Sequence, residues 1–303
     1  MKPYRLLVLL CMVITFSSGF NTGRKSPFSV KETIQGIELS ENGHPVFDYQ
    51  RKPKSLTGEY ICNNYIHPLY SVNGDTLTDE FPADHPFHRG IFWAWHQLYI
   101  DNKSIGDGWI VKDIALDVFK LKTNISDSTA QIDVDVHWKS SVWQNGKPFV
   151  HEHSTILVHQ LKPDSTRSID FEINLRALVP GVTIGGSNDE KGYGGFSTRI
   201  KLPEDLVFTS EEGAVIPQTL PTKAGSWLNF SGSIGSKRRT TSITLISLPG
   251  IPEYPVRWIL RKEGSMQNIV FPGRQRIELL ENQPIVLKYR IIIKKGRRLK
   301  NNF

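Results

Sequence analysis

The strongest constraint on the fold is an alternation of apolar and polar residues with a period of two. It runs through residues 131–138 and 168–175, where every second residue is apolar. Successive side chains of a β-strand point to opposite faces, so this pattern is typical of strands with one buried and one solvated face. No window of helical length carries an apolar stripe with a period of 3.6 residues, and 18 prolines and 24 glycines oppose long helices. The sequence therefore predicts an all-β protein.

Other segments extend this prediction to most of the chain. The runs 91–95 and 285–287 are apolar at every position, which indicates central strands covered on both faces. Turn signals such as Asn145-Gly146 separate the strands. We expect a large antiparallel β-sandwich, as a single domain over residues 20–293. The remaining predicted strands are 149–161, 196–200, 226–230, 242–248 and 289–293.

The first nineteen residues have the pattern of a secretory signal peptide. Lys2 and Arg5 precede an apolar run from Leu6 to Phe16, and small residues follow up to Gly19. A retained anchor is the alternative, but this run would span only about 16 Å as a helix, roughly half of a bilayer core. No later run is long enough to cross a membrane, so we expect an exported, periplasmic or secreted protein. Removal after Gly19 leaves Cys62 as the only cysteine, which we expect to be a buried small side chain without a disulfide.

The net charge of +7 comes from the two ends of the chain. Lys2 and Arg5 would leave with the signal peptide, and five basic residues lie in the predicted tail, 294–303. The remaining body has no net charge and no basic stripe, so we exclude nucleic-acid binding as the function. The tail could contact an anionic surface, but a solvated tail is the simpler expectation. Its basic residues are Lys294, Lys295, Arg297, Arg298 and Lys300.

The clearest chemical signal is a histidine-rich segment. Residues 67–96 contain four of the nine histidines. Pro86 favours an extended backbone between His85 and His88, so both imidazoles should project to the same side of a loop. Asp84 and Arg89 flank the pair with charges that would set the tautomer and orientation of the rings. The four histidines are His67, His85, His88 and His96.

Three explanations compete for this segment. The imidazoles could form a metal-free polar site for hydrogen bonding or acid–base chemistry, they could bind a metal, or each could satisfy a local turn. Four histidines within thirty residues favour a site. No helical His-Glu-x-x-His motif or cysteine pair supports a metal, so we predict neither a metal nor a cofactor.

A second candidate is the tripeptide His151-Glu152-His153. Alternation places both histidines on one face of a strand and Glu152 on the other. A carboxylate on the dry face needs a partner or a raised pKa, which would make Glu152 a candidate general acid or base. The alternative is an ion pair at the rim of a sheet.

The third candidate is the glycine-rich stretch 185–196, which leads into a strand bearing Arg199. Asp189, Glu190 and Lys191 lie between its glycines, which permit close approach of the backbone. This composition favours a binding or catalytic loop, and a mobile surface hairpin is the alternative. The phosphate-loop motif is absent.

These segments resemble a bacterial family labelled methane oxygenase PmoA, over residues 40–296. Phe87 stands where a third histidine is common in that pattern. A methane-oxidising membrane subunit needs long apolar helices that this chain lacks, so we discard that activity. The resemblance also implies a galactose-mutarotase-like β-sandwich with a sugar site on a concave face. The matching segments are 65–70, 79–90, 92–96, 189–199, 224–230 and 256–258.

Together these observations predict a carbohydrate-active protein, and sugar epimerisation or glycoside cleavage are the reactions considered. A non-catalytic glycan-binding module and a histidine-ligated metal enzyme are the alternatives. His88 is the first acid–base candidate, with Glu152, Asp189 or Glu190 as its partner. Trp93 would offer an apolar platform for a sugar ring. The predicted substrate-binding residues are His67, His85, Arg89, Trp93, His96, His153, Lys191 and Arg199.

Overall fold

Two large antiparallel sheets face each other in the computed structural model, which describes residues 26–296 except 235–238, 253 and 255. The first sheet contains β1–β5, β13, β20, β19 and β16, in that order. These strands are Phe28–Glu32, Gly36–Glu41, His44–Gln50, Tyr65–Leu69, Ile91–Ala94, Gly195–Thr198, Gln267–Val270, Arg257–Ile259 and Thr222–Lys223.

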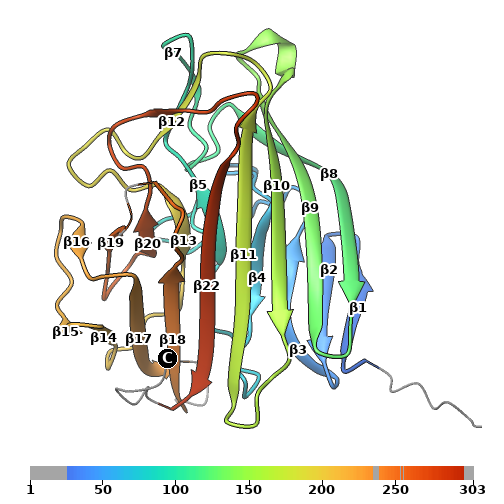
Figure 1. Ribbon diagram of the computed structural model, residues 1–303, viewed down its shortest axis with the longest axis vertical. Helices are drawn as coiled ribbons and strands as arrows, with labels where there is room; N and C mark the ends of the chain where they lie inside the picture. The colour runs from blue at the N-terminus through green and yellow to red at the C-terminus, as the bar shows by residue number, and fades with distance from the viewer. Residues whose placement is uncertain (1–25, 235–238, 253, 255, 297–303) are drawn as a thin grey trace, which may run out of the picture.

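The second sheet contains the longest strands, which lie side by side in Figure 1 from β22 to β8. Its order is β15, β14, β17, β18, β22, β11, β10, β9 and β8. These strands are Gly213–Val215, Val207–Ser210, Trp227–Ile234, Arg239–Ser247, Ile285–Lys295, Thr166–Ala177, Pro148–His159, Thr129–Ser140 and Ile114–Ile125.

A smaller sheet closes one end of the sandwich, near the top of Figure 1. It contains β21 (Ile277–Glu278), β12 (Val182–Gly185), β6 (Gln97–Ile100) and β7 (Lys103–Gly106). A short 3₁₀ turn, Gln144–Gly146, connects β9 to β10. Within the described residues no helix is long and apolar enough to span a membrane.

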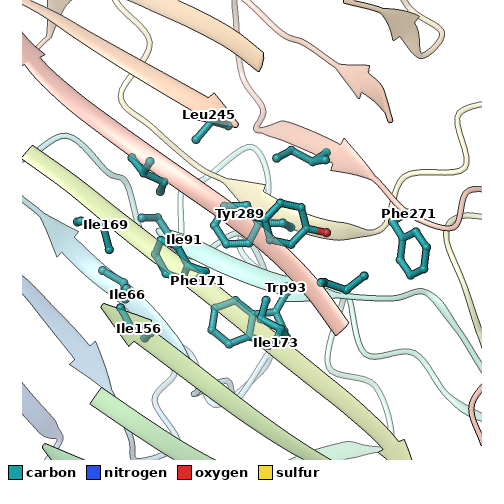
Figure 2. Close-up of a cluster of buried hydrophobic side chains, with 14 of the residues drawn as sticks. Ile66, Ile91, Trp93, Ile156, Ile169, Phe171, Ile173, Leu245, Phe271 and Tyr289 are labelled. Atoms are coloured by element: carbon teal, nitrogen blue, oxygen red, sulfur yellow. The ribbon is translucent and has the colours of Figure 1, made fainter. Parts of the chain in front are cut away.

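The apolar core lies between the two large sheets, as Figure 2 shows. Phe196 of β13 packs against Phe171 of β11 and Tyr289 of β22, with ring centroids 5.0 and 4.6 Å apart. Trp93 of β5 stacks on Phe196 from the same sheet. Large aromatic side chains bury much apolar area, so this cluster joins the layers strongly.

The structure confirms the predicted all-β, antiparallel sandwich. The apolar residues of 131–138 and 168–175 all point into the core. Residues 91–95 are buried on both faces, as expected. Ile285 and Val286 are only half-buried, however. Val286 lies on the solvated side of β22, and Ile285 is the first residue of the strand and packs at the margin of the core. Cys62 is buried and forms no disulfide, and burial raises the pKa of its thiol.

Both ends of the chain fall partly outside the described residues. The predicted signal peptide, 1–19, lies entirely in the part that is not described. Lys294 and Lys295, assigned to the tail from sequence, are the last residues of β22, and Lys294 lies 3.6 Å from a carboxylate oxygen of Asp164. Residues 297–303 of the predicted tail lie outside the described range.

Pairing of β5 with β13 brings together three segments that are distant in sequence. Ile91 is opposite Thr198, so the residues before β5 lie beside those after β13. The Arg199 N–H donates to the Gly90 carbonyl oxygen at 2.7 Å, and the Asp79 N–H donates to the Arg199 carbonyl oxygen at 2.9 Å. The sheet therefore places Arg199 directly beside the histidine-rich segment.

Candidate functional site

A cavity of about 300 Å³ opens beside the histidine-rich segment, at the low end of the size range of small-molecule sites. We call it the histidine pocket. Its walls come from four loops: the loop before β5, the loop between β7 and β8, the glycine-rich loop before β13, and the loop between β19 and β20. They include His85, Phe87, His88, Trp109, Lys191, Tyr193, Arg261 and residues 263–266.

His85 belongs to a chain of three side chains that ends at the pocket. The Arg199 guanidinium donates to both carboxylate oxygens of Asp84, at 2.9 and 2.8 Å. The Asp84 Oδ2 atom lies 2.7 Å from Nδ1 of His85. Burial by itself would raise the pKa of Asp84, but hydrogen bonds from Arg199 and His85 lower it to about 2. The ionised carboxylate accepts the Nδ1 proton of His85, which leaves Nε2 for a ligand.

His88 lies deeper and is held neutral. It is 2% exposed, and its ring stacks on His85 with centroids 4.6 Å apart, so the two imidazoles project to the same side. The backbone between them is not extended as predicted but forms a turn, in which the His88 N–H donates to the His85 carbonyl oxygen at 2.9 Å. Its Nδ1 atom lies 3.5 Å from Nη1 of Arg199. Burial, and then the charges of His85, Arg199 and Arg89, lower the pKa of His88 to about 2. A group with this pKa stays unprotonated near neutral pH, which suits hydrogen bonding better than proton transfer.

This depressed pKa predicts a loss of stability in mild acid. Below pH 6.5 the unfolded chain binds a proton at residue 88 that the folded protein excludes down to about pH 2. We expect stability to fall with pH in that window, by about 2 kcal/mol between pH 6.5 and 4.5 for this one group. Urea unfolding at the two pH values should show that His88→Asn removes this part of the pH dependence.

The control for this experiment is His44→Asn, which changes an exposed histidine of β3. It should leave the pH dependence of the wild-type protein intact. Equal pH dependence in the His88 and His44 variants would contradict the neutral, buried state of His88.

The glycine-rich loop delivers Lys191 and Tyr193 to the pocket. A Cβ atom at Gly186 would lie 2.1 Å from the carbonyl oxygen of Gly192, so the two sides of this loop approach too closely for larger residues. The Ser187 N–H donates to the Tyr193 carbonyl oxygen at 2.8 Å and closes the loop. The loop is thus a tight, hydrogen-bonded structure with two side chains at the pocket.

The two acidic residues of this loop, Asp189 and Glu190, do not line the histidine pocket. Asp189 accepts hydrogen bonds from the Ser187 hydroxyl and from the backbone N–H groups of Lys191 and Gly192. Although burial opposes it, these bonds lower the pKa of Asp189. Glu190 is exposed and does not line the pocket. Within the described residues neither carboxylate is hydrogen-bonded to His88, so the structure does not form the predicted pair.

Trp109 forms the back of the pocket. It is fully buried, stacks on His96 at 5.3 Å, and meets Tyr193 edge-on at 5.1 Å. The Nδ1 atom of His96 lies 2.8 Å from Oδ2 of Asp107. The Trp109 Nε1 and His96 Nε2 atoms are buried without a hydrogen-bond partner among the described residues. A buried polar atom without a hydrogen bond lowers the stability of the fold unless a ligand or a water molecule bonds to it.

Arg89 supports the pocket from behind. Its side chain is 1% exposed, and Nη1 donates to the carbonyl oxygens of Phe87 and Trp109, at 2.9 and 3.3 Å. Its guanidinium lies 4.5 Å from the centroid of the Phe92 ring. Arg89 therefore ties two walls together, and it lies behind the pocket, where the predicted direct contact with a substrate has no exposed surface.

Sequence reasoning missed Trp109, Tyr193, Arg261 and Glu263. Arg261 and Glu263 lie in the hairpin loop between β19 and β20, which carries no cluster of unusual residues. Only the pairing of β20 with β13 brings this loop to the pocket. Trp109 and Tyr193 stand in the sequence as single aromatic residues in or near predicted loops, and nothing in their local pattern indicates that they meet.

Glu152 and Trp93 lie in the core instead of the pocket. Glu152 is fully buried between the sheets and accepts hydrogen bonds from the indole N–H groups of Trp93 and Trp138, at 2.8 and 2.9 Å. Asn64 and Ser154 also donate to it, at 2.9 and 2.7 Å. The carboxylate thus links both sheets, and neither residue is available to a sugar.

His153 and His67 also lie away from the pocket. His153 is on the solvated face of β10, where its Nδ1 atom and Nε2 of His151 both lie near Oδ1 of Asp135, at 2.9 and 3.1 Å. His67 is in β4, with Nδ1 2.9 Å from the Thr78 hydroxyl. Of the predicted residues, the structure brings His85, His88 and Lys191 to the pocket, with Arg199, Arg89 and His96 behind its walls.

The histidines do not assemble into a metal-ligating set. Within the described part of the chain, no group of three or more histidine, cysteine, aspartate or glutamate side chains could hold a metal ion. A metal site made of His85, His88 and one of His96, His151 or His153, which is the ligand set that the metal-enzyme alternative requires, does not form. His151 and His153 lie on β10 of the second sheet, whereas His85 and His88 lie in the loop before β5 of the first sheet.

The sequence profile of one family matches residues 36–302, which is most of the chain. This family is described as a family of unknown function (DUF6807). The chain belongs to this family. The predicted relationship to the family labelled methane oxygenase PmoA is therefore wrong. The motifs used for that assignment cover the same region, but they do not identify that family.

The other comparisons add little. No curated protein matches the chain significantly. Among solved structures, YeaD from Salmonella typhimurium, a proposed mutarotase, is similar over 89% of this chain and 88% of its own. The identity is 8% and the TM-score is 0.37, a level of similarity that carries no information about the substrate.

Proposed function

We propose that the histidine pocket binds a sugar and that His85 exchanges a proton with it. The observation that carries this proposal is the chain Arg199–Asp84–His85, which leaves one imidazole nitrogen at the wall of a cavity of about 300 Å³. An ionised carboxylate that orients an imidazole is a common arrangement for acid–base catalysis.

The other walls support a polyhydroxylated ligand. Phe87 and Tyr193 are half-buried aromatic side chains that could cover the apolar face of a sugar ring. His88, kept neutral, offers a hydrogen bond without a charge. Lys191 and Glu263 add a cation and a carboxylate at the rim, so both donors and acceptors surround the cavity.

The reaction that this set favours is the opening and reclosing of a sugar hemiacetal. His85 Nε2 would take the proton of the anomeric hydroxyl while the bond from C1 to the ring oxygen breaks. The Lys191 ammonium would give a proton to the ring oxygen, and the reverse transfers on reclosing would restore both residues. Two groups of opposite proton demand in one pocket suffice for this reaction.

Anomer exchange measured by NMR on a panel of reducing sugars tests the proposal. We expect the wild-type protein to accelerate exchange of at least one sugar, and His85→Gln to lower this rate at least about 100-fold. Asp84→Asn should also lower it, because the amide cannot orient the imidazole in the same way. His153→Gln, on the solvated face of β10, is the matched control and should retain the full rate.

Full exchange activity in the His85 variant would remove this residue from the mechanism. Binding of sugars without any acceleration would favour the non-catalytic glycan-binding module. Absence of binding by every sugar in the panel would reject the sugar pocket itself.

We also infer export of the protein, on the basis of the signal-like segment 1–19. The presence of a single cysteine after residue 19 is compatible with an oxidising compartment, because Cys62 is buried and has no partner for an internal disulfide. Analysis of the mature N-terminus by mass spectrometry would test this inference.

A further inference from the structure

The histidine pocket continues into a second cavity of about 530 Å³. The two cavities share three wall residues, Lys191, Arg261 and Glu263, so they adjoin. The second is larger than the first and is bounded on its other side by residues 216–219. One sugar ring in the histidine pocket would leave this neighbouring space unused.

Arg261 holds the far wall of the second cavity in place. Its Nη1 atom donates to the Gln218 carbonyl oxygen at 2.8 Å, and Nη2 donates to that of Thr219 at 2.9 Å. The backbone of Arg261 is itself fixed by Gln267, a fully buried residue of β20 that bonds to its N–H and carbonyl groups, at 2.9 and 2.8 Å. The cavity wall is therefore anchored to the sheet.

The fixed wall presents apolar surface to solvent. Ile216 is 80% exposed, and it lines the cavity together with Pro217. A contiguous apolar patch rimmed by polar residues is typical of a ligand-binding groove, and Ile216 and Pro217 form such a patch beside the histidine pocket. Its position next to Lys191 and Glu263 combines an apolar surface with polar groups, which suits the C–H face and the hydroxyls of a sugar ring.

We propose that the second cavity is a subsite for a second sugar residue, so that the natural ligand is at least a disaccharide. This inference rests on the proposed sugar site in the histidine pocket. The reducing sugar occupies the histidine pocket beside His85, and the residue attached to it packs on Ile216 and Pro217. Arg261 holds the far wall of this subsite in place and does not itself bind the sugar through these donors, because its guanidinium already bonds to three backbone carbonyls.

Calorimetric titration with matched sugars tests this subsite. The probes are D-glucose, D-mannose, D-galactose and D-xylose, each paired with disaccharides that end in the same reducing sugar. We expect the preferred disaccharide to bind at least tenfold more tightly than its monosaccharide. Ile216→Ser should reduce this ratio to below threefold and leave the affinity for the monosaccharide unchanged.

The matched control is Leu220→Ser, which alters another exposed aliphatic residue four positions further along but outside both cavities. It should leave the ratio unchanged. Equal affinities for a monosaccharide and its disaccharides, or equal effects of the two serine variants, would overturn the subsite while leaving the sugar pocket standing. Failure of every mono- and disaccharide to bind would overturn both proposals.

Discussion

Replacing Gly90 with alanine should destabilise the protein by at least about 4 kcal/mol. Gly90 has a φ of +43°, and a Cβ atom there would lie 1.9 Å from the Ile66 carbonyl oxygen and 2.9 Å from Cβ of His67. Both neighbours belong to β4, in the middle of the first sheet, and cannot move without breaking its pairing with β5. The substitution therefore combines a strained backbone with a steric clash.

The same change should disrupt the histidine pocket. Gly90 lies between Arg89 and β5, and its carbonyl oxygen accepts the N–H of Arg199. A displaced residue 90 would separate Arg199 from Asp84 and loosen the support of His85. We expect reduced sugar binding even at temperatures where the variant remains folded, as measured by calorimetry beside thermal unfolding.

Gly43→Ala is the matched control for Gly90→Ala. Gly43 also has a positive φ, +77°, but no atom lies within 4 Å of the added Cβ. Backbone strain alone should then lower the free energy of unfolding of this variant by about 1 kcal/mol. If both variants lost the same stability, the close approach of Gly90 to β4 would not be a constraint on the fold.

Local patterns predicted the strands whose sides differ most in burial. In β9 and β11, alternate side chains enter the core or reach solvent, so the alternation of apolar and polar residues in the sequence matches the alternation of burial. The strand β8 was not predicted because it lies at the edge of its sheet and contains an irregularity in register between Val118 and Lys120. Exposed, irregular edge strands have weak alternation, and only their pairing identifies them.

The candidate site was predictable where its geometry is local. His85 and His88 are three residues apart in one loop, and their common direction was predicted, although a turn between them and not an extended backbone brings the rings together. The bond between Asp84 and Arg199 joins residues 115 positions apart and depends on the pairing of β5 with β13. Glu263 likewise lines the pocket only because β20, which follows its loop, pairs with β13. No single-sequence pattern carries this information.

Glu152 shows the limit of alternation as evidence. The pattern correctly placed this carboxylate on the face opposite His151 and His153, and the structure shows that this face is the buried one. It could not identify the donors, because Trp93 belongs to the opposite sheet, Asn64 directly precedes β4 of that sheet, and Trp138 belongs to the neighbouring strand. A buried acid with four donors is a structural link between layers, whereas the same acid in a cleft would be a catalytic candidate.

Changing Glu152 to leucine should lower the free energy of unfolding by at least about 4 kcal/mol. Leucine fills similar space but leaves four donors without an acceptor in the core: two indoles, an amide and a hydroxyl. Each such group costs about 1–3 kcal/mol when it is buried and unpaired. Glu152→Gln should be milder, because its amide oxygen still accepts some of these bonds. Urea unfolding followed by tryptophan fluorescence measures both effects.

Two comparisons separate this structural role from a catalytic one. Glu172→Leu removes a half-exposed carboxylate of the adjacent β11, whose partner Lys288 is also solvated, so it should change stability by less than about 0.5 kcal/mol. Glu152→Gln, if it folds, should retain the sugar affinity and the exchange rate of the wild-type protein, because Glu152 lies between the sheets and away from the histidine pocket. A stable Glu152→Gln variant without activity would instead assign this residue to the chemistry and contradict its position in the core.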